Sequence, residues 1–149
     1  MTRTFGTRSR GNLNTTHPLL VQIAERALQL SATDFTVICG YRDKAGQDEA
    51  LRNKTTKVSY PNSAHNQTGP DGKGRSCAID VLPYPFTNWE DPHMLTGWKS
   101  IADAMFQAAK ELKTEVRWGG DFNRDGVKTQ SDAWDKPHFE LHPWRNFAK

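Results

Sequence analysis

Short β-branched segments and amphipathic segments of helical period follow one another in this chain in an irregular order, and that order restricts the fold. Apolar residues recur with a helical period after Pro18, and over a longer stretch after Asp91-Pro92. Because strands and helices do not alternate regularly, the sequence predicts an α+β fold in which helices pack against a small antiparallel sheet. The strand-like segments are 35–39, 77–82, 115–118 and 139–141.

The chain has 149 residues, which fits one domain over residues 1–149. Residues 1–15 are polar and poorly patterned, so we expect a loosely docked arm. The two cysteines are too few for a disulfide framework, and we expect Cys39 and Cys77 to be reduced thiols. No segment resembles a membrane span, and no apolar stretch follows the basic N-terminus. The sequence therefore predicts neither membrane insertion nor a signal peptide.

The net charge of +3 is a mild positive excess. It suits an anionic partner such as a cell-wall polymer or nucleic acid. Ordinary solubility explains it as well, because the sequence has no dense basic cluster.

Asp80 interrupts an apolar strand segment, where an ionised carboxylate is costly unless it is paired or bound to a metal. Pairing with an arginine is the ordinary explanation. His65, Asp80 and His138 could instead supply three ligands from separate segments, the pattern of a catalytic zinc site with one open position. A competing set, His138, Glu140 and His142, would lie on one face of a strand and could bind a metal as a local triplet.

Asp135 and Arg42 are candidate catalytic residues. Asp135 stands three residues before His138, where an acid could take a proton from water and deliver it to a leaving amine. Arg42 follows the strand segment 35–39, where a guanidinium could polarise a carbonyl or hold a carboxylate. The alternatives are a loop carboxylate or helix cap for Asp135, and a surface ion pair for Arg42.

Five motifs, in this order, resemble those of the zinc peptidases that include D-alanyl-D-alanine carboxypeptidases and the L-alanyl-D-glutamate endopeptidases of phage endolysins. The resemblance extends from about residue 17 to residue 142 and is strongest to the short, single-domain endolysin peptidases. The motifs are Gly-Tyr-Arg-Asp-x-x-x-Gln (40–47), Ser-x-His (63–65), Ala-Ile-Asp-Val (78–81), Trp-Gly-Gly-Asp (118–121) and Asp-x-Pro-His-Phe-Glu-Leu (135–141).

The resemblance implies a fold of the Hedgehog and D-Ala-D-Ala peptidase type, with a zinc site at the sheet. It implies that one zinc ion is held by His65, Asp80 and His138. Asp135 would be the general base and then the general acid, and Arg42 would stabilise the developing oxyanion. Gln47 and Ser63 match motif positions that support Arg42 or bind substrate.

The function implied by the resemblance is zinc-dependent hydrolysis of the L-alanyl-D-glutamate bond in peptidoglycan stem peptides, which would lyse bacteria. The alternative with the same chemistry is a D-alanyl-D-alanine carboxypeptidase or dipeptidase. The alternative of another class is a non-catalytic metal-binding module for the cell wall or for nucleic acid. For the peptidase we expect a monomer without a wall-binding domain or a nucleic-acid partner. It would stay in the host cytoplasm until a holin-type protein releases it to the periplasm and wall.

Two features depart from the family pattern. Fourteen residues, 66–79, separate His65 from Asp80, more than is usual, so we expect an inserted loop that shapes the substrate groove or acts as a lid. The acid is Asp135, whereas many relatives use Glu, and the shorter side chain requires a closer backbone.

Residues 121–132 have the spacing of a twelve-residue calcium-binding loop, with Gly126 at the turn position. Asp132 stands where a bidentate Glu is usual. An Asx-rich turn without metal is the alternative. If calcium binds, ordering of this loop could place Asp135 and His138, so calcium would regulate activity. The candidate calcium ligands are Asp121, Asn123, Asp125, the backbone carbonyl of Val127, and Asp132.

Overall fold

The computed structural model describes residues 2–54, 56, 58–120 and 135–148. Within this part of the chain, four strands form one antiparallel sheet in the order β1-β2-β4-β3. The α+β fold with a small antiparallel sheet is thus confirmed. The strands are β1 (Phe35–Cys39), β2 (Ala78–Pro83), β3 (Val116–Trp118) and β4 (His138–Leu141). The helices are α1 (Thr7–Leu13), α2 (Pro18–Leu30), α3 (Lys44–Arg52) and α4 (Pro92–Glu111), with short 3-10 helices η1 (Ala64–Asn66) and η2 (Trp144–Asn146).

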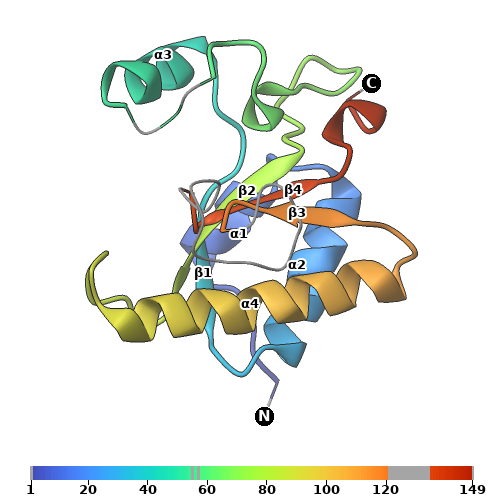
Figure 1. Ribbon diagram of the computed structural model, residues 1–149. Helices are drawn as coiled ribbons and strands as arrows, with labels where there is room; N and C mark the ends of the chain where they lie inside the picture. The colour runs from blue at the N-terminus through green and yellow to red at the C-terminus, as the bar shows by residue number, and fades with distance from the viewer. Residues whose placement is uncertain (1, 55, 57, 121–134, 149) are drawn as a thin grey trace.

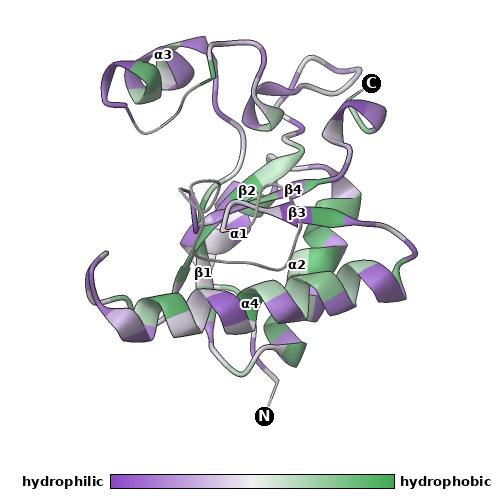
Figure 2. Cartoon of the chain, in the orientation of Figure 1, coloured by the Kyte–Doolittle hydropathy of each residue, from purple (hydrophilic) through white to green (hydrophobic). Residues whose placement is uncertain are grey.

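Helices α1, α2 and α4 pack on one another or on the sheet, whereas α3 stands apart in Figure 1. In Figure 1, α4 runs along the bottom of the view and α3 lies at the top, with the strands between them. Helices α2 and α4 pack against each other, and α4 also contacts β2 and β3. Apolar and polar residues alternate along α2 and α4 in Figure 2, which is typical of helices with one buried face. The core therefore lies between these two helices and the sheet.

Helix α4 begins where the sequence predicts. The Asp91 side chain caps it by accepting a hydrogen bond from the His93 N–H, and Pro92 occupies the first turn. Trp98 is 1% exposed, and its indole N–H donates to the Val81 carbonyl of β2 at 3.0 Å. Burying side chains of this size stabilises the fold by roughly 1.5–3 kcal/mol each. This face of α4 fixes the position of β2.

Among the described residues, none of the helices combines the length and the hydropathy needed to cross a membrane.

The N-terminal segment is bound more closely than a loosely docked arm, so that expectation is wrong for residues 7–13. Leu13 is fully buried in helix α1, which packs on β1. Ser9 Oγ accepts from the Val37 N–H at 3.0 Å, and Asn12 Nδ2 donates to the Val37 carbonyl at 2.8 Å. Polar side chains thus form hydrogen bonds with backbone groups of an edge strand that, within the described part of the chain, has no neighbouring strand on that side. A search for apolar periodicity does not detect this role.

The strand register collects polar side chains at one place. The β2–β4 pairing sets Asp80 opposite His138. The β1–β2 register shifts between Val37 and Cys39, which sets Cys39 opposite Asp80. Because β2 and β4 are the two inner strands, this cluster lies at the middle of the sheet.

Candidate active site

His65 is held rigidly in helix η1. Ser63 caps this helix, with its hydroxyl accepting from the His65 N–H at 3.2 Å. The His65 ring is 2% exposed, and its Nδ1 lies 2.8 Å from the Gly40 carbonyl oxygen. A carbonyl only accepts hydrogen bonds, so Nδ1 carries the proton and Nε2 of the neutral ring presents a lone pair. That lone pair faces Asp80.

His138 is oriented from the other side by Glu140. Its Nε2 lies 2.6 Å from Glu140 Oε1, and both side chains are buried. Arg117 holds the other carboxylate oxygen, with Nη2 at 2.7 Å and Nε at 3.1 Å from Glu140 Oε2. Glu140 therefore accepts the Nε2 proton, and Nδ1 of the neutral ring is left as the lone-pair atom.

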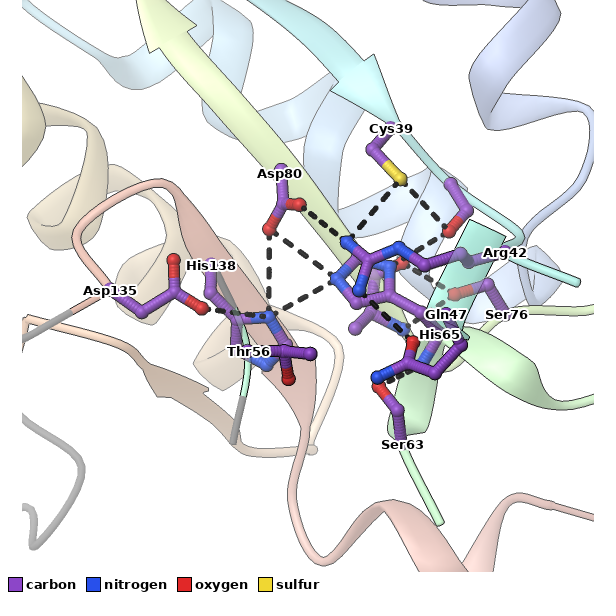
Figure 3. A network of polar contacts seen from close by, with 12 residues as sticks. Cys39, Arg42, Gln47, Thr56, Ser63, His65, Ser76, Asp80, Asp135 and His138 are labelled. Carbon is purple, nitrogen blue, oxygen red and sulfur yellow. Dashed lines mark hydrogen bonds and ion pairs between the residues drawn. The ribbon is translucent and has the colours of Figure 1, made fainter. Parts of the chain in front are cut away.

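Three atoms with lone pairs converge at the middle of the sheet (Figure 3). His65 Nε2 lies 3.2 Å from His138 Nδ1 and 3.4 Å from Asp80 Oδ1, and His138 Nδ1 lies 3.5 Å from the same oxygen. Ligand atoms around a tetrahedral zinc ion lie about 3.3–3.5 Å apart, given bonds of about 2.0–2.2 Å. Asp80 Oδ1 is buried and has no hydrogen-bond partner. Donor chemistry and spacing therefore fit a zinc ion.

The electrostatics of the cluster favour positive charge. Burial by itself lowers the pKa of both imidazoles, but Asp80 outweighs it and raises the pKa of His65 to about 10. Asp80 and Glu140 raise the pKa of His138 to about 9 in the same way. Burial would raise the pKa of Asp80, yet the two imidazoles hold it well below its usual range. The cluster can therefore be stabilised either by protons on the imidazoles or by a bound metal cation.

Asp135 lies beside the cluster, where its backbone runs close to the backbone of Gly119. Its Oδ2 is 3.9 Å from His138 Nδ1, and its N–H donates to the Gly119 carbonyl at 3.2 Å. A Cβ at Gly119 would overlap the Asp135 carbonyl oxygen, so this approach requires glycine. Burial, reinforced by the Asp80 charge, raises the pKa of Asp135 to about 6. A carboxyl group with this pKa can exchange a proton near neutral pH.

Arg42 points into the same cluster. Its Nη2 lies 3.4 Å from Asp80 Oδ2, and its Nη1 donates to Gln47 Oε1 at 3.0 Å. Gln47 is fully buried, and its Oε1 also accepts from Asn66 Nδ2 at 3.1 Å. Asn66 Nδ2 is in addition 2.9 Å from the Arg42 carbonyl oxygen. Arg42 therefore belongs to the site, and Gln47 and Asn66 fix its position.

Sequence reasoning missed Arg117, which holds Glu140, and also Asn66 and Cys39. Asn66 had a detectable signal, because with Ser63 it forms a capping box around η1. Cys39 had none, because only the irregular β1–β2 register places it beside Asp80. Burial would raise the pKa of the Cys39 thiol, but His65 and Arg42 lower it below its usual value. Cys39, His65 and Asp80 form a second possible metal-binding group. Cys39 and Cys77 are both free thiols, as predicted.

The competing local triplet is not assembled. Glu140 contacts the nitrogen of His138 that faces away from Asp80. His142 lines a different cavity of about 650 Å³, together with Phe106 and other residues from the end of α4. The alternation of the strand predicted a shared face, but the chain turns at His142, one residue beyond the end of β4 at Leu141.

A cavity of about 500 Å³ opens over the cluster. This volume is typical of small-ligand sites. All the predicted zinc ligands and catalytic residues contribute to its wall, and Ser63 does so while capping η1. The described residues that line it are Ile38, Arg42, Thr56, Val58, Asn62, Ser63, Ala64, His65, Asp80, Trp89, Arg117, Asp135, Pro137, His138, Glu140 and Trp144.

Residues 66–79 do not line this cavity and therefore form no part of its wall, while a role as a lid stays a prediction. The segment folds back on itself, with Thr68 bridged to Gly74. A Cβ at Gly74 would lie 2.5 Å from Tyr41 Cγ, so the fold-back rests directly on that ring. The insertion therefore supports the segment that carries Arg42.

The candidate calcium ligands Asp121, Asn123, Asp125, Val127 and Asp132 lie outside the described residues.

The fold and the site together define the class, a small α+β protein with a polar cavity into which two imidazoles, three carboxylates and two guanidinium groups converge. A family model described as phage L-alanyl-D-glutamate peptidase matches residues 1–142, and the chain belongs to this family. It is 33% identical over 142 residues to the L-alanyl-D-glutamate peptidase of Escherichia phage T5, covering 92% of this chain and 96% of the relative.

A solved structure has the same architecture. The crystal structure of the Serratia marcescens L-Ala D-Glu endopeptidase ChiX matches with a TM-score of 0.73 and 30% sequence identity, covering 99% of this chain and 96% of that one. The resemblance based on the five motifs is thereby confirmed.

Proposed function

We propose that this protein is a peptidase that hydrolyses the L-alanyl-D-glutamate bond of peptidoglycan stem peptides, with one zinc ion held by His65, Asp80 and His138. The observation that carries the metal assignment is the convergence of three buried lone-pair atoms within 3.5 Å, one of them an Asp80 oxygen without a hydrogen-bond partner. Membership of the family supports the choice of bond over a D-alanyl-D-alanine linkage. It also favours an enzyme over a non-catalytic binding module.

Zinc, when bound, supplies Lewis-acid polarisation of the amide carbonyl and of the attacking water. Asp135 takes a proton from that water at its carboxylate and then delivers it to the departing amine nitrogen. In the metal-free site, burial and the Asp80 charge raise the pKa of Asp135 to about 6, so this carboxyl group can both accept and donate a proton near neutral pH. Arg42 donates hydrogen bonds to the carbonyl oxygen as negative charge develops there, and Gln47 and Asn66 hold its guanidinium in place.

The biological role that follows from a phage peptidase of this kind is lysis of the host. Peptidoglycan lies outside the cytoplasmic membrane, so we propose that the monomeric enzyme reaches the wall after release by a holin-type protein. We propose that it acts without a nucleic-acid partner.

The calcium loop remains a proposal from the sequence of residues 121–132, whose oxygen-bearing side chains have the spacing of a calcium site. We expect calcium to raise activity and the melting temperature Tm. The protein is treated with a chelator, reconstituted with zinc, and then assayed for activity and Tm with and without added calcium. Asp125→Ala, which lacks one candidate calcium ligand, is measured in the same way. Equal rates and equal Tm with and without calcium would reject a regulatory site.

The main experiment counts zinc and products together. Purified protein is tested for zinc per chain and for cleavage of a defined stem peptide, beside His138→Ala and Asp135→Asn. We expect one zinc and a product with a new N-terminal D-glutamate for wild type, loss of zinc for His138→Ala, and retained zinc without turnover for Asp135→Asn. Release of free D-alanine instead would identify the carboxypeptidase alternative. No cleavage by wild type, together with cell-wall binding that Asp135→Asn leaves intact, would identify a binding module.

A further inference from the structure

Trp89 is a large aromatic residue left exposed at the wall of the active-site cavity. Its side chain is 60% exposed, yet it lines the same cavity as Arg42, His65 and Asp135. It belongs to the segment between β2 and α4, at the left of Figure 1. Exposed aromatic surface beside a polar site is typical of ligand contact rather than of core packing.

The indole ring of Trp89 is held in a fixed orientation. It stacks on Trp98, with ring centroids 5.6 Å apart and an interplanar angle of 17°. Phe86 supports it edge-on, at 5.2 Å and 66°. Trp98 is itself buried and bonded to the Val81 carbonyl. One side of the Trp89 ring therefore rests on a buried residue, and Trp89 still keeps 60% of its surface exposed.

The other tryptophan of the cavity wall differs. The ring of Trp144 has the Arg145 guanidinium over it at 4.3 Å, and Trp144 packs against the hydrophobic core. Among the described cavity-lining residues, Trp89 is thus the tryptophan that stacks on a buried ring and remains mostly exposed.

The proposed substrate supplies a matching group. In peptidoglycan the stem-peptide alanine is joined through its nitrogen to the lactyl ether of N-acetylmuramic acid. One alanine, at most about 3.6 Å of chain, therefore separates the scissile bond from the sugar-bearing lactyl group. A pyranose ring presents a flat array of C–H groups, which packs well on an indole face and removes apolar area from water.

We propose that Trp89 is the platform of a sugar subsite, which binds the N-acetylmuramic acid ring that carries the stem peptide being cut. This assignment rests on the proposed function, because it assumes that the peptide bond in the cavity is the one next to the sugar-linked alanine. The subsite makes the enzyme prefer peptide attached to glycan over free peptide.

The test compares two substrates on the same variants. One is the stem peptide linked to N-acetylmuramic acid, and the other is the same peptide with an acetylated N-terminus and no sugar. We expect Trp89→Ala to lower kcat/KM about five- to tenfold for the sugar-linked substrate and to leave the free peptide unchanged. Trp89→Leu keeps apolar contact with Trp98 but lacks the flat ring, and it should behave in the same way. Tyr84→Ala is the matched control, since Tyr84 is 59% exposed in the same segment but does not line the cavity.

Equal losses on both substrates, or no loss on either, would overturn the sugar subsite while leaving the peptidase activity intact. A direct binding readout separates the two proposals. The indole N–H resonance of Trp89, assigned by its disappearance in Trp89→Leu, should shift when N-acetylmuramic acid itself is added. A shift without cleavage of either substrate by wild type would support the subsite and reject the proposed bond. No shift at saturating sugar, with cleavage independent of the sugar, would reject the subsite alone.

Discussion

Glu140 Oε1 lies 2.6 Å from Nε2 of His138, so a buried carboxylate sets which nitrogen of this imidazole faces Asp80. Removing such a carboxylate typically costs 10–100-fold in metal affinity. We therefore expect Glu140→Ala to weaken zinc binding by about that factor, and Glu140→Gln by less, because its amide oxygen still accepts the ring N–H. Competition with a chelator measures the affinity. The exposed residue Glu90, changed to Gln, is the control, and wild-type affinity in Glu140→Ala would contradict the role.

Removal of metal should destabilise the fold at its centre. A ligand that binds the native state alone stabilises it by about 2.7 kcal/mol at a hundred times its dissociation constant. Chelation should therefore lower Tm, and zinc should restore it. Thermal unfolding of wild type and His65→Ala in both conditions tests this, because the variant has lost a ligand and should show no zinc-dependent shift. An identical Tm for chelated and zinc-loaded wild type would count against the metal site.

Arg42 should act through the geometry of its guanidinium as well as its charge. Loss of one oxyanion donor typically costs about 10²–10³ in kcat. Lysine keeps the charge but cannot contact Gln47 and Asp80 as the two-pronged guanidinium does. We expect Arg42→Lys to lose kcat in this range with zinc content unchanged. Arg52→Lys, at the exposed end of α3, should have wild-type kinetics. Full activity of Arg42→Lys would show that charge alone suffices.

Gly119 should be intolerant of any side chain. A Cβ there would collide with the Asp135 carbonyl oxygen, so Gly119→Ala must displace the segment that carries the acid. We expect a strong fall in kcat together with a lower free energy of unfolding. Gly11→Ala is the opposite case, because its Cβ would meet nothing within 4 Å. In helix α1 it should stabilise the protein by about 0.8–1 kcal/mol. Urea unfolding measures the stability of both variants, and steady-state kinetics measures their kcat.

Leu13 tests the docking of the N-terminal helix. Its side chain is fully buried, so Leu13→Ala should lower the free energy of unfolding by about 2–5 kcal/mol. Arg8→Ala, exposed on the same helix, should change it by less than about 0.5 kcal/mol. Urea titration of the two variants gives the values. Equal stabilities would mean that the helix adds nothing to the core.

The sequence predicted those parts of the molecule that are specified by neighbouring residues. The β-branched segment 35–39 is strand β1 with the same bounds, and Asp91-Pro92 begins α4 as its capping chemistry requires. Asp80 was identified because a carboxylate conflicts with an apolar strand. Contacts between segments that are distant in the sequence could not be predicted from neighbouring residues. The position of Cys39 depends on a shift of strand register, and the role of Gly119 depends on a backbone sixteen residues away. Ser9 and Asn12 act through hydrogen bonds to β1, which hydrophobic periodicity does not report.

The position of β4 in the sheet also determines when the cluster can form during synthesis of the chain. The strand made last, β4, inserts between β2 and β3 and brings His138 to Asp80. A ribosome has to translate and release this strand before the cluster exists, so a nascent chain that contains His65, Asp80 and Arg42 still lacks His138, one of the three proposed metal ligands. We therefore expect translation products that stop before β4 to lack the proposed hydrolytic activity.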